Sequence, residues 1–276
     1  MFKFKGLIIG LFIICVFILL AIFAPLLSSH DPGAIYTEFL RVPPYWSAQG
    51  IRSFLLGTDD LGRDILSRLL FGTRISLLVG LSVVTISLSC GTILGLLSGY
   101  FKGTMDTIIM GVIDVLMSFP SILLAILVIS ILGPGLPNAV MAVAIVGIPN
   151  FTRVVRSSVM VEINKDYHLA AVSSGAGSTR IIFKEIFPNI LAPLIVQGTL
   201  GFSEAILNVA ALGFLGLGAQ PPLPEWGIML SDARPFIESD PWMVTLPGLC
   251  IFLVLLGFNL MGDGLRDFFD PKLKRR

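Results

Sequence analysis

The chain has 276 residues, of which 55% are hydrophobic and only 13% are charged, and its mean hydropathy is +0.90. A soluble domain carries about 25% charged residues, so the composition excludes a disordered protein, a nucleic-acid-coating protein and an ordinary cytosolic enzyme. A net charge of +1 provides no long-range field for acidic partners. The remaining class is an integral membrane protein, with room for about five to seven helices of roughly 20 residues and their loops.

Uncharged stretches predict six membrane-spanning helices, at residues 6–29, 75–101, 107–132, 139–155, 190–217 and 242–262. The first follows Lys3 and Lys5 as a signal peptide would, but its uncharged run is too long for one and further spans follow. Pro120 predicts a kink in the third span. The Pro and Gly residues of 133–138 favour a turn that separates the third span from the fourth.

The Lys and Arg residues predict the orientation. If the N-terminus is inside, 13 of the 19 basic residues lie in cytoplasmic segments, which places both termini in the cytoplasm. The expected domains are an N-terminal transmembrane helix at 1–29, a periplasmic segment at 30–71, a transmembrane core at 72–263 with an inner loop at 156–189, and a basic cytoplasmic tail at 264–276. The amphipathic stretch 64–77 predicts a short interfacial helix before the second span.

The inner loop is too long for a simple connector, and loops beyond about 12–15 residues are usually functional. Residues that start helices (Asn164 or Asp166, then Ser178) and residues that stop them (Gly175, Gly177, Pro188) predict two short helices. Ala170 and Ala171 would form a small knob that fits a groove on another protein. The alternatives are a solvated connector and a DNA-binding helix–turn–helix, and the missing dense basic face argues against the second.

Two acidic residues fall within the predicted spans, Asp114 near the inner end of the third and Glu204 halfway along the fifth. A carboxylate at mid-bilayer costs about 2.5–3.5 kcal/mol on insertion scales, so it faces a cavity or a partner. Asn208, one turn after Glu204, extends a polar stripe. Two interpretations stay open: a lining of a transport path, where a carboxylate meets the ammonium group of a peptide, and a helix–helix hydrogen bond.

The remaining motifs point to packing rather than to chemistry. Gly91, Gly95 and Gly99 form a repeated GxxxG face, which predicts close helix packing within the chain or against a partner. The three cysteines lie in apolar runs without a CxxC spacing, and no HExxH motif is present, so no metal site is expected. The chain also has no Gly-x-x-x-x-Gly-Lys-Ser/Thr phosphate loop.

At the inner loop the sequence resembles the EAA loop of ABC importer inner-membrane permeases. Ala170, Ala171, Gly175 and Pro188 match that pattern, whereas Leu169, Glu185 and Phe187 depart from it. The stretches 56–68, 214–222, 224–227, 259–267 and 270–273 resemble the dipeptide, oligopeptide and nickel group of these permeases. The stretch 189–197 is most similar to the "C" type of dipeptide permease subunit.

The resemblance implies an all-α, six-helix type-1 ABC permease fold in the bacterial inner membrane. It implies a non-catalytic subunit without a cofactor of its own, which forms half of the path of an ATP-driven importer for dipeptides or short peptides. Its partners would be a second permease, two cytoplasmic ATPases that bind ATP and Mg, and a periplasmic or lipid-anchored peptide-binding protein, with no nucleic acid. A nickel-chelate, haem or longer-oligopeptide importer and an ion-coupled secondary transporter are the alternatives.

The resemblance also implies three groups of site residues. Contact with the ATPases would involve Asp166, Tyr167, Leu169, Ala170, Ala171, Gly175, Ala176, Arg180 and Pro188. Glu204, Asn208 and Asp114 are the candidates for the substrate path. Asp59, Asp60, Arg63, Trp226 and Arg234 are the candidates for contact with the binding protein.

Overall fold

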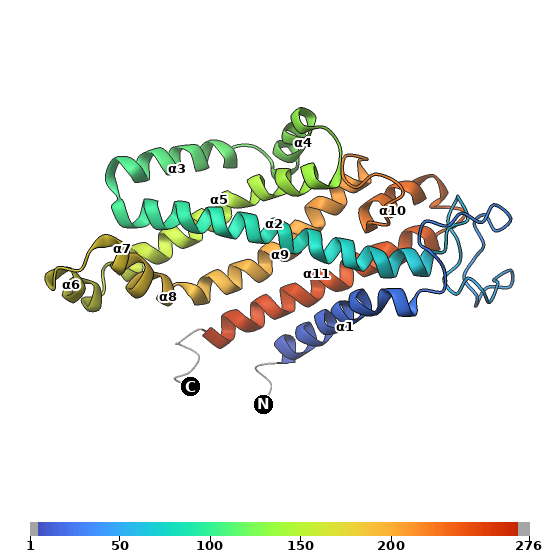
Figure 1. Ribbon diagram of the computed structural model, residues 1–276, viewed down its shortest axis with the longest axis horizontal. Coiled ribbons are helices and arrows are strands. Elements are labelled where there is room, and N and C mark those ends of the chain that lie inside the picture. Colours follow the sequence, from blue (N-terminus) through green and yellow to red (C-terminus); the bar gives the residue numbers. More distant parts are fainter. Residues whose placement is uncertain (1–4, 270–276) are drawn as a thin grey trace.

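The computed structural model describes residues 5–269, and its ordered elements in that range are helices (Figure 1). Five are long and apolar enough to cross a membrane: α1 (Lys5–Leu27), α2 (Ile65–Phe101), α5 (Leu136–Glu162), α9 (Leu191–Phe214) and α11 (Trp242–Phe269). A bent pair, α3 (Gly103–Met117) and α4 (Ser121–Leu132), makes a sixth candidate. The shorter elements are α6 (Asp166–Ser173), α7 (Ser178–Arg180), a π-helical turn (Ile181–Ile186), α8 (Phe187–Asn189), α10 (Trp226–Ala233) and a 3-10 turn (Arg234–Phe236). The predicted all-α class with about six spans is confirmed.

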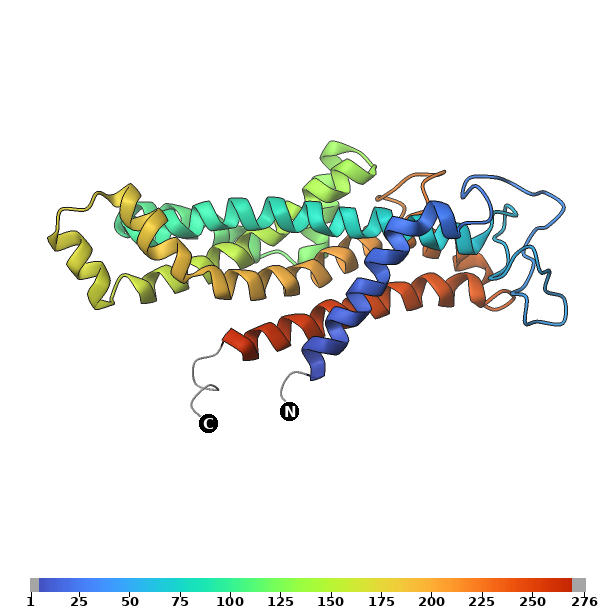
Figure 2. The ribbon, with the colours of Figure 1, turned by 60° about the horizontal axis from the view of Figure 1, so that its bottom comes forward.

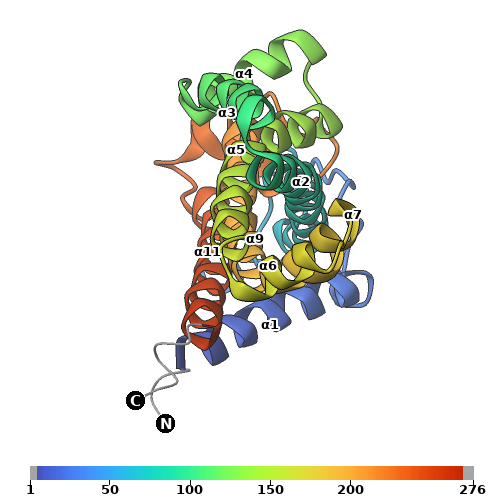
Figure 3. The ribbon, with the colours of Figure 1, turned by 90° about the vertical axis from the view of Figure 1, so that its left-hand side faces the viewer.

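The long helices form one elongated bundle. Helices α2, α5 and α9 run side by side in its middle, and α1 crosses α11 on one flank (Figure 2). Seen along the bundle from the α6 end, α3 and α4 lie on the side opposite α1 (Figure 3). The segment between α1 and α2 lies at one end of the bundle and α6 at the other, so these two segments are far apart.

Glycines allow α2 and α5 to approach closely. A Cβ atom added at Gly91 would lie 2.5 Å from the Cβ of Phe151, and one at Gly95 would lie 2.5 Å from the Cβ of Val155. At Gly99 the same construction gives 2.8 Å to the Cβ of Val159. The predicted GxxxG packing is confirmed, and its partner among the described residues is α5 of the same chain.

The third span differs from the prediction. Instead of one kinked helix at 107–132, the chain forms α3 and α4, whose axes meet at 94° across the break at residues 118–120. Pro120 cannot donate a backbone hydrogen bond, and it lies at the N-cap of α4. The predicted kink is therefore a complete interruption of the helix.

Two ion pairs attach α3 to α5. Arg153 contacts Asp114 with a nitrogen–oxygen distance of 2.6 Å. Arg156 binds both carboxylate oxygens of Asp106, at 2.6 and 2.7 Å. These contacts fix the position of α3, most of whose side chains point away from the bundle.

Two predicted domain features also differ. Residues 65–77 are not a separate interfacial helix but the first turns of α2, which Asp64 caps by accepting a hydrogen bond from the backbone N–H of Ser67 at 3.1 Å. Helix α11 continues to Phe269, so residues 264–269 of the predicted tail are helical, and residues 270–276 lie outside the described part of the chain.

Candidate functional site

Helix α6 protrudes from the end of the bundle opposite the 28–64 segment (Figure 1). It begins at Asp166 with Lys165 as N-cap, and neither Asn164 nor Asp166 caps it with a side chain, contrary to the prediction. It ends before Gly175, whose φ of +76° is a conformation that glycine adopts without strain. Ser178 is the first residue of α7 rather than its cap.

One face of α6 packs and the other is free. Ala171 and Ala176 lie against an apolar cluster that includes Ile181 and Ile186. Leu169 and Val172 are 58% and 51% exposed. Among the predicted contact residues, Asp166, Ala170, Gly175, Arg180 and Pro188 are also exposed. The structure thus places an apolar exposed surface where the sequence predicts a docking element.

Glu162, which the sequence analysis missed, anchors α6 to the end of α5. Its buried carboxylate accepts a hydrogen bond from the Tyr167 hydroxyl at 2.6 Å and contacts the Lys165 ammonium at 2.7 Å. Burial, then the adjacent Glu162, raises the pKa of Tyr167 to about 12, so the phenol keeps its proton at neutral pH. The available signal was an acidic residue inside the predicted loop, five residues before Tyr167.

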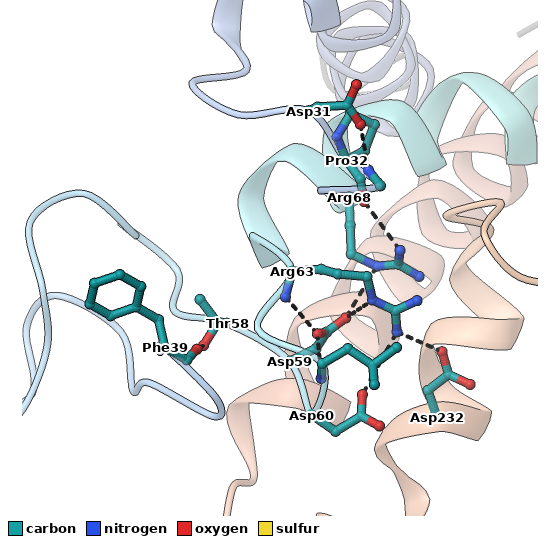
Figure 4. A network of polar contacts seen from close by, with 11 residues as sticks. Asp31, Pro32, Phe39, Thr58, Asp59, Asp60, Arg63, Arg68 and Asp232 are labelled. Atoms are coloured by element: carbon teal, nitrogen blue, oxygen red, sulfur yellow. Dashed lines mark hydrogen bonds and ion pairs between the residues drawn. The ribbon is translucent and has the colours of Figure 1, made fainter. Parts of the chain in front are cut away.

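At the other end, buried charges join the segment before α2 to α10 (Figure 4). Arg63 is 4% exposed and contacts Asp59 at 2.6 Å, Asp232 at 3.1 Å and Asp60 at 3.7 Å. Arg68 lies 3.5 Å from Asp59 and donates to the backbone oxygen of Pro32 at 3.3 Å. These contacts tie the 28–64 segment to the helical bundle.

This network corrects the prediction of a binding-protein surface. Asp59, Arg63 and Trp226 are buried, and the Trp226 indole donates to the backbone oxygen of Leu69 at 3.4 Å. They cannot meet a partner in this conformation. Asp60 is half-buried, and Arg234 is exposed above the ring of Phe214. Burial and the neighbouring Asp59 raise the pKa of Asp60.

The structure separates Asp114 from the other two candidates for the substrate path. Asp114 pairs with Arg153 and does not line the hollows beside α9. Glu204 and Asn208 lie together on α9 and line one hollow with Gln197 and with Asn150 of α5. Gln197 and Asn150 were not predicted, although Gln197 precedes Glu204 by about two helical turns and so shares its face. Among residues 5–269, no group of three His, Cys, Asp or Glu residues is arranged to hold a metal ion.

The architecture defines the class of protein. A chain of the methionine ABC transporter MetNI, solved in inward-facing conformations, matches with a TM-score of 0.59 at 20% identity, covering 73% of this chain and 96% of that chain. The fold is therefore that of a type-1 ABC permease.

The chain belongs to the family of binding-protein-dependent transport system inner membrane components, whose model matches residues 91–275. The N-terminal transmembrane domain of oligopeptide transport permease C matches residues 1–44. The predicted resemblance is confirmed, and the chain is a multi-pass permease subunit of the bacterial inner membrane.

Several relatives match over most of their length. The di/tripeptide transport system permease protein DppC of Pseudomonas aeruginosa is 53% identical, covering 98% of this chain and 89% of the relative. The dipeptide transport system permease protein DppC of Escherichia coli is also 53% identical, covering 98% and 90%. The glutathione transport system permease protein GsiD of Pectobacterium atrosepticum is 50% identical, covering 79% and 73%.

Proposed function

We propose that this chain is one of two permease subunits of an ATP-driven importer of dipeptides and other short peptides. The relatives named as di/tripeptide and dipeptide permeases support this cargo, because they match nearly the whole chain at about half identity. The chain would form half of the path and a second, homologous permease the other half. A peptide-binding protein would deliver the cargo at the 28–64 end.

The observation that carries the coupling role is the exposed apolar face of α6. Leu169 and Val172 lie three residues apart on a short helix at one tip of the molecule, so they form one small patch. Apolar residues at such a tip are suited to a groove on another protein. The excess of Lys and Arg on this side of the sequence favours the cytoplasm for it.

The chemistry of ATP would reside in the partners. The sequence has no phosphate loop, so two cytoplasmic ATPase subunits would bind ATP and Mg, and this chain would be non-catalytic. Closure of the ATPase pair would move α6. The tie between Tyr167 and Glu162 would pass that movement to α5 as a rigid-body displacement.

Uptake of a labelled dipeptide tests both parts of this proposal. A strain that lacks its own dipeptide permeases is complemented with the full importer carrying the wild-type chain, Val172→Glu or Val161→Glu. Val161, on the last turns of α5, is 61% exposed and receives the same chemical change as a control.

We expect Val172→Glu to lower uptake at least about tenfold, because a charge is placed in the centre of an apolar contact. Peptide-stimulated ATP hydrolysis by the purified complex should fall in parallel, and Val161→Glu should retain both activities. If Val172→Glu took up as much dipeptide as Val161→Glu, α6 would have no role in coupling. If the wild-type importer took up no dipeptide, the assignment of dipeptides as its cargo would be refuted.

A further inference from the structure

Four polar side chains of α5 and α9, each half-buried or exposed, make no hydrogen bond or ion pair with any described residue. They are Asn150 of α5 and Gln197, Glu204 and Asn208 of α9. Nearby hydroxyls behave differently: Ser87 donates to the backbone oxygens of Val83 and Ala144. Polar groups within spans are costly and are usually satisfied, so four together without partners indicate a surface that meets something outside the chain.

These side chains share one surface. Gln197, Gly201, Glu204 and Asn208 follow one another at intervals of four, three and four residues, which places them on one face of α9. The face is about 16 Å long at about 1.5 Å per residue. All four line one hollow with Asn150.

The hollow adjoins the interruption of the third span. Glu204 and Asn150 also line a second hollow of about 100 Å³, whose other wall includes Phe119 and Ser121 at the junction of α3 and α4. Because α4 turns away from α3, the bundle is open beside Glu204.

Glu204 forms no ion pair with a Lys or Arg among residues 5–269. It is exposed, and no Lys or Arg lines either hollow. The basic residues of α5 on this side, Arg153 and Arg156, are held by Asp114 and Asp106. A carboxylate within a span needs a charge partner or water, and because no described residue pairs with Glu204, its exposed carboxylate is available to a cationic group of another molecule.

We propose that this face of α9 binds the peptide in transit, with the Glu204 carboxylate accepting hydrogen bonds from the protonated α-amino group. An ammonium group donates three hydrogens, and its bonds to a carboxylate are charge-assisted. The side-chain amides of Asn150, Gln197 and Asn208 both donate and accept, as a peptide bond requires when it leaves water. This inference rests on the proposed function and deepens it by naming the cargo group that the permease itself recognises.

The dimensions suit passage rather than storage. A dipeptide spans about 7 Å when extended, because each residue adds about 3.3–3.6 Å. It is therefore shorter than the polar face and would exchange one amide for the next as it moves along α9. The single carboxylate gives the face a preference for the amino end of the peptide.

The test uses the complete importer in proteoliposomes, with its binding protein outside and ATP inside. Initial uptake of labelled Ala-Ala is measured for the wild-type chain, Glu204→Gln, Glu204→Asp and Asp267→Asn, the last of which removes an exposed carboxylate near the end of α11. We expect Glu204→Gln to reduce uptake about tenfold or more, because a charge-assisted bond becomes a neutral one. Glu204→Asp should retain part of the rate and Asp267→Asn all of it.

A second measurement reads binding directly. Glu204→Cys is made in a chain where Cys15, Cys90 and Cys250 are replaced by alanine, and the rate of modification by a cationic methanethiosulfonate is followed in the assembled importer. The proposal requires that Ala-Ala with ATP slow this modification. A thiol that is unreactive in the assembled importer would show that a partner subunit covers the position, and a reactive thiol that the peptide does not protect would show that the peptide passes elsewhere. Either result overturns the inference.

The failure of the inference is distinguishable from that of the proposed function. If the wild-type importer takes up Ala-Ala and Glu204→Gln matches it, only the role of Glu204 is lost. If the wild-type importer takes up no peptide, the cargo assignment is lost and this inference with it.

Discussion

Replacing Gly95 by alanine tests whether the contact between α2 and α5 holds the bundle together. The added Cβ would lie 2.5 Å from the Cβ of Val155 and 2.8 Å from the backbone oxygen of Thr152. The backbone oxygen belongs to a helix and cannot rotate away, so α2 and α5 must separate. Gly198 provides the matched control, because a Cβ there meets nothing within 4 Å.

The magnitude follows from comparing the two substitutions. Both lie inside helices, so both gain the same preference of alanine over glycine, about 1 kcal/mol. Gly95→Ala additionally overpacks an interface, which costs about 1–3 kcal/mol. For a chain of this size each kcal/mol shifts the melting temperature by about 2–4 °C, so the two variants should melt roughly 2–12 °C apart, with Gly95→Ala lower.

The assay heats each purified variant in detergent and measures the fraction that remains monodisperse by size-exclusion chromatography. Tryptophan fluorescence of the same samples reports unfolding independently. If Gly95→Ala melts at or above the temperature of Gly198→Ala, the close approach of α2 and α5 is not a determinant of stability and the reasoning is refuted.

Three further outcomes are expected, at the two ends of the bundle. Arg63→Met should lower the free energy of unfolding by about 3 kcal/mol, because it leaves Asp59 buried with a weakened partner; adding Asp59→Asn should restore part of it, as measured by denaturant unfolding. Asp60→Asn should raise the melting temperature at pH 7. The pKa of Asp60 is raised in the folded chain, so the folded chain holds this proton more tightly than the unfolded chain, and the stability of the wild type falls as the pH rises above the ordinary value of 3.8. Below pH 3.8 the variant and the wild type should melt alike. Tyr167→Phe should cost about 1.5–3 kcal/mol, since it removes a hydrogen bond to the buried carboxylate of Glu162. In the wild type that contribution should persist up to pH 10.0 and disappear as the pH rises towards about 12, because the phenol pKa is raised in the folded state.

The helices were predictable from the sequence because their signal is local. An apolar run of suitable length forms a helix across the bilayer whatever surrounds it, and all six predicted runs correspond to helical segments. The break at Pro120 was predictable as a kink but not as a 94° turn. The angle depends on where ion pairs such as Arg153–Asp114 hold α3, and those pairs join residues far apart in the sequence.

The surface of the 28–64 segment and α10 was harder to predict for the same reason. Charged and aromatic residues in a loop are typical of a hydrated protein–protein interface, and on that basis Arg63 and Trp226 are predicted to contact a partner. Arg63 instead contacts Asp232, 169 residues later, and Trp226 is fully buried in the apolar core. On α9, a charge within a span was sufficient to find Glu204, but Asn150 joins it only through the packing of α5 against α9.

Helix α2 has a mechanical consequence. Its 37 residues form a rod about 55 Å long at about 1.5 Å per residue, well beyond the roughly 30 Å of hydrocarbon in a bilayer. One tip is fixed by Asp64 beside the buried arginines, and at the other Tyr100 meets His168 of α6 edge-on, with ring centroids 6.2 Å apart. A tilt imposed at one tip therefore moves the opposite tip, so one continuous helix links the 28–64 segment mechanically to α6 at the other end of the bundle.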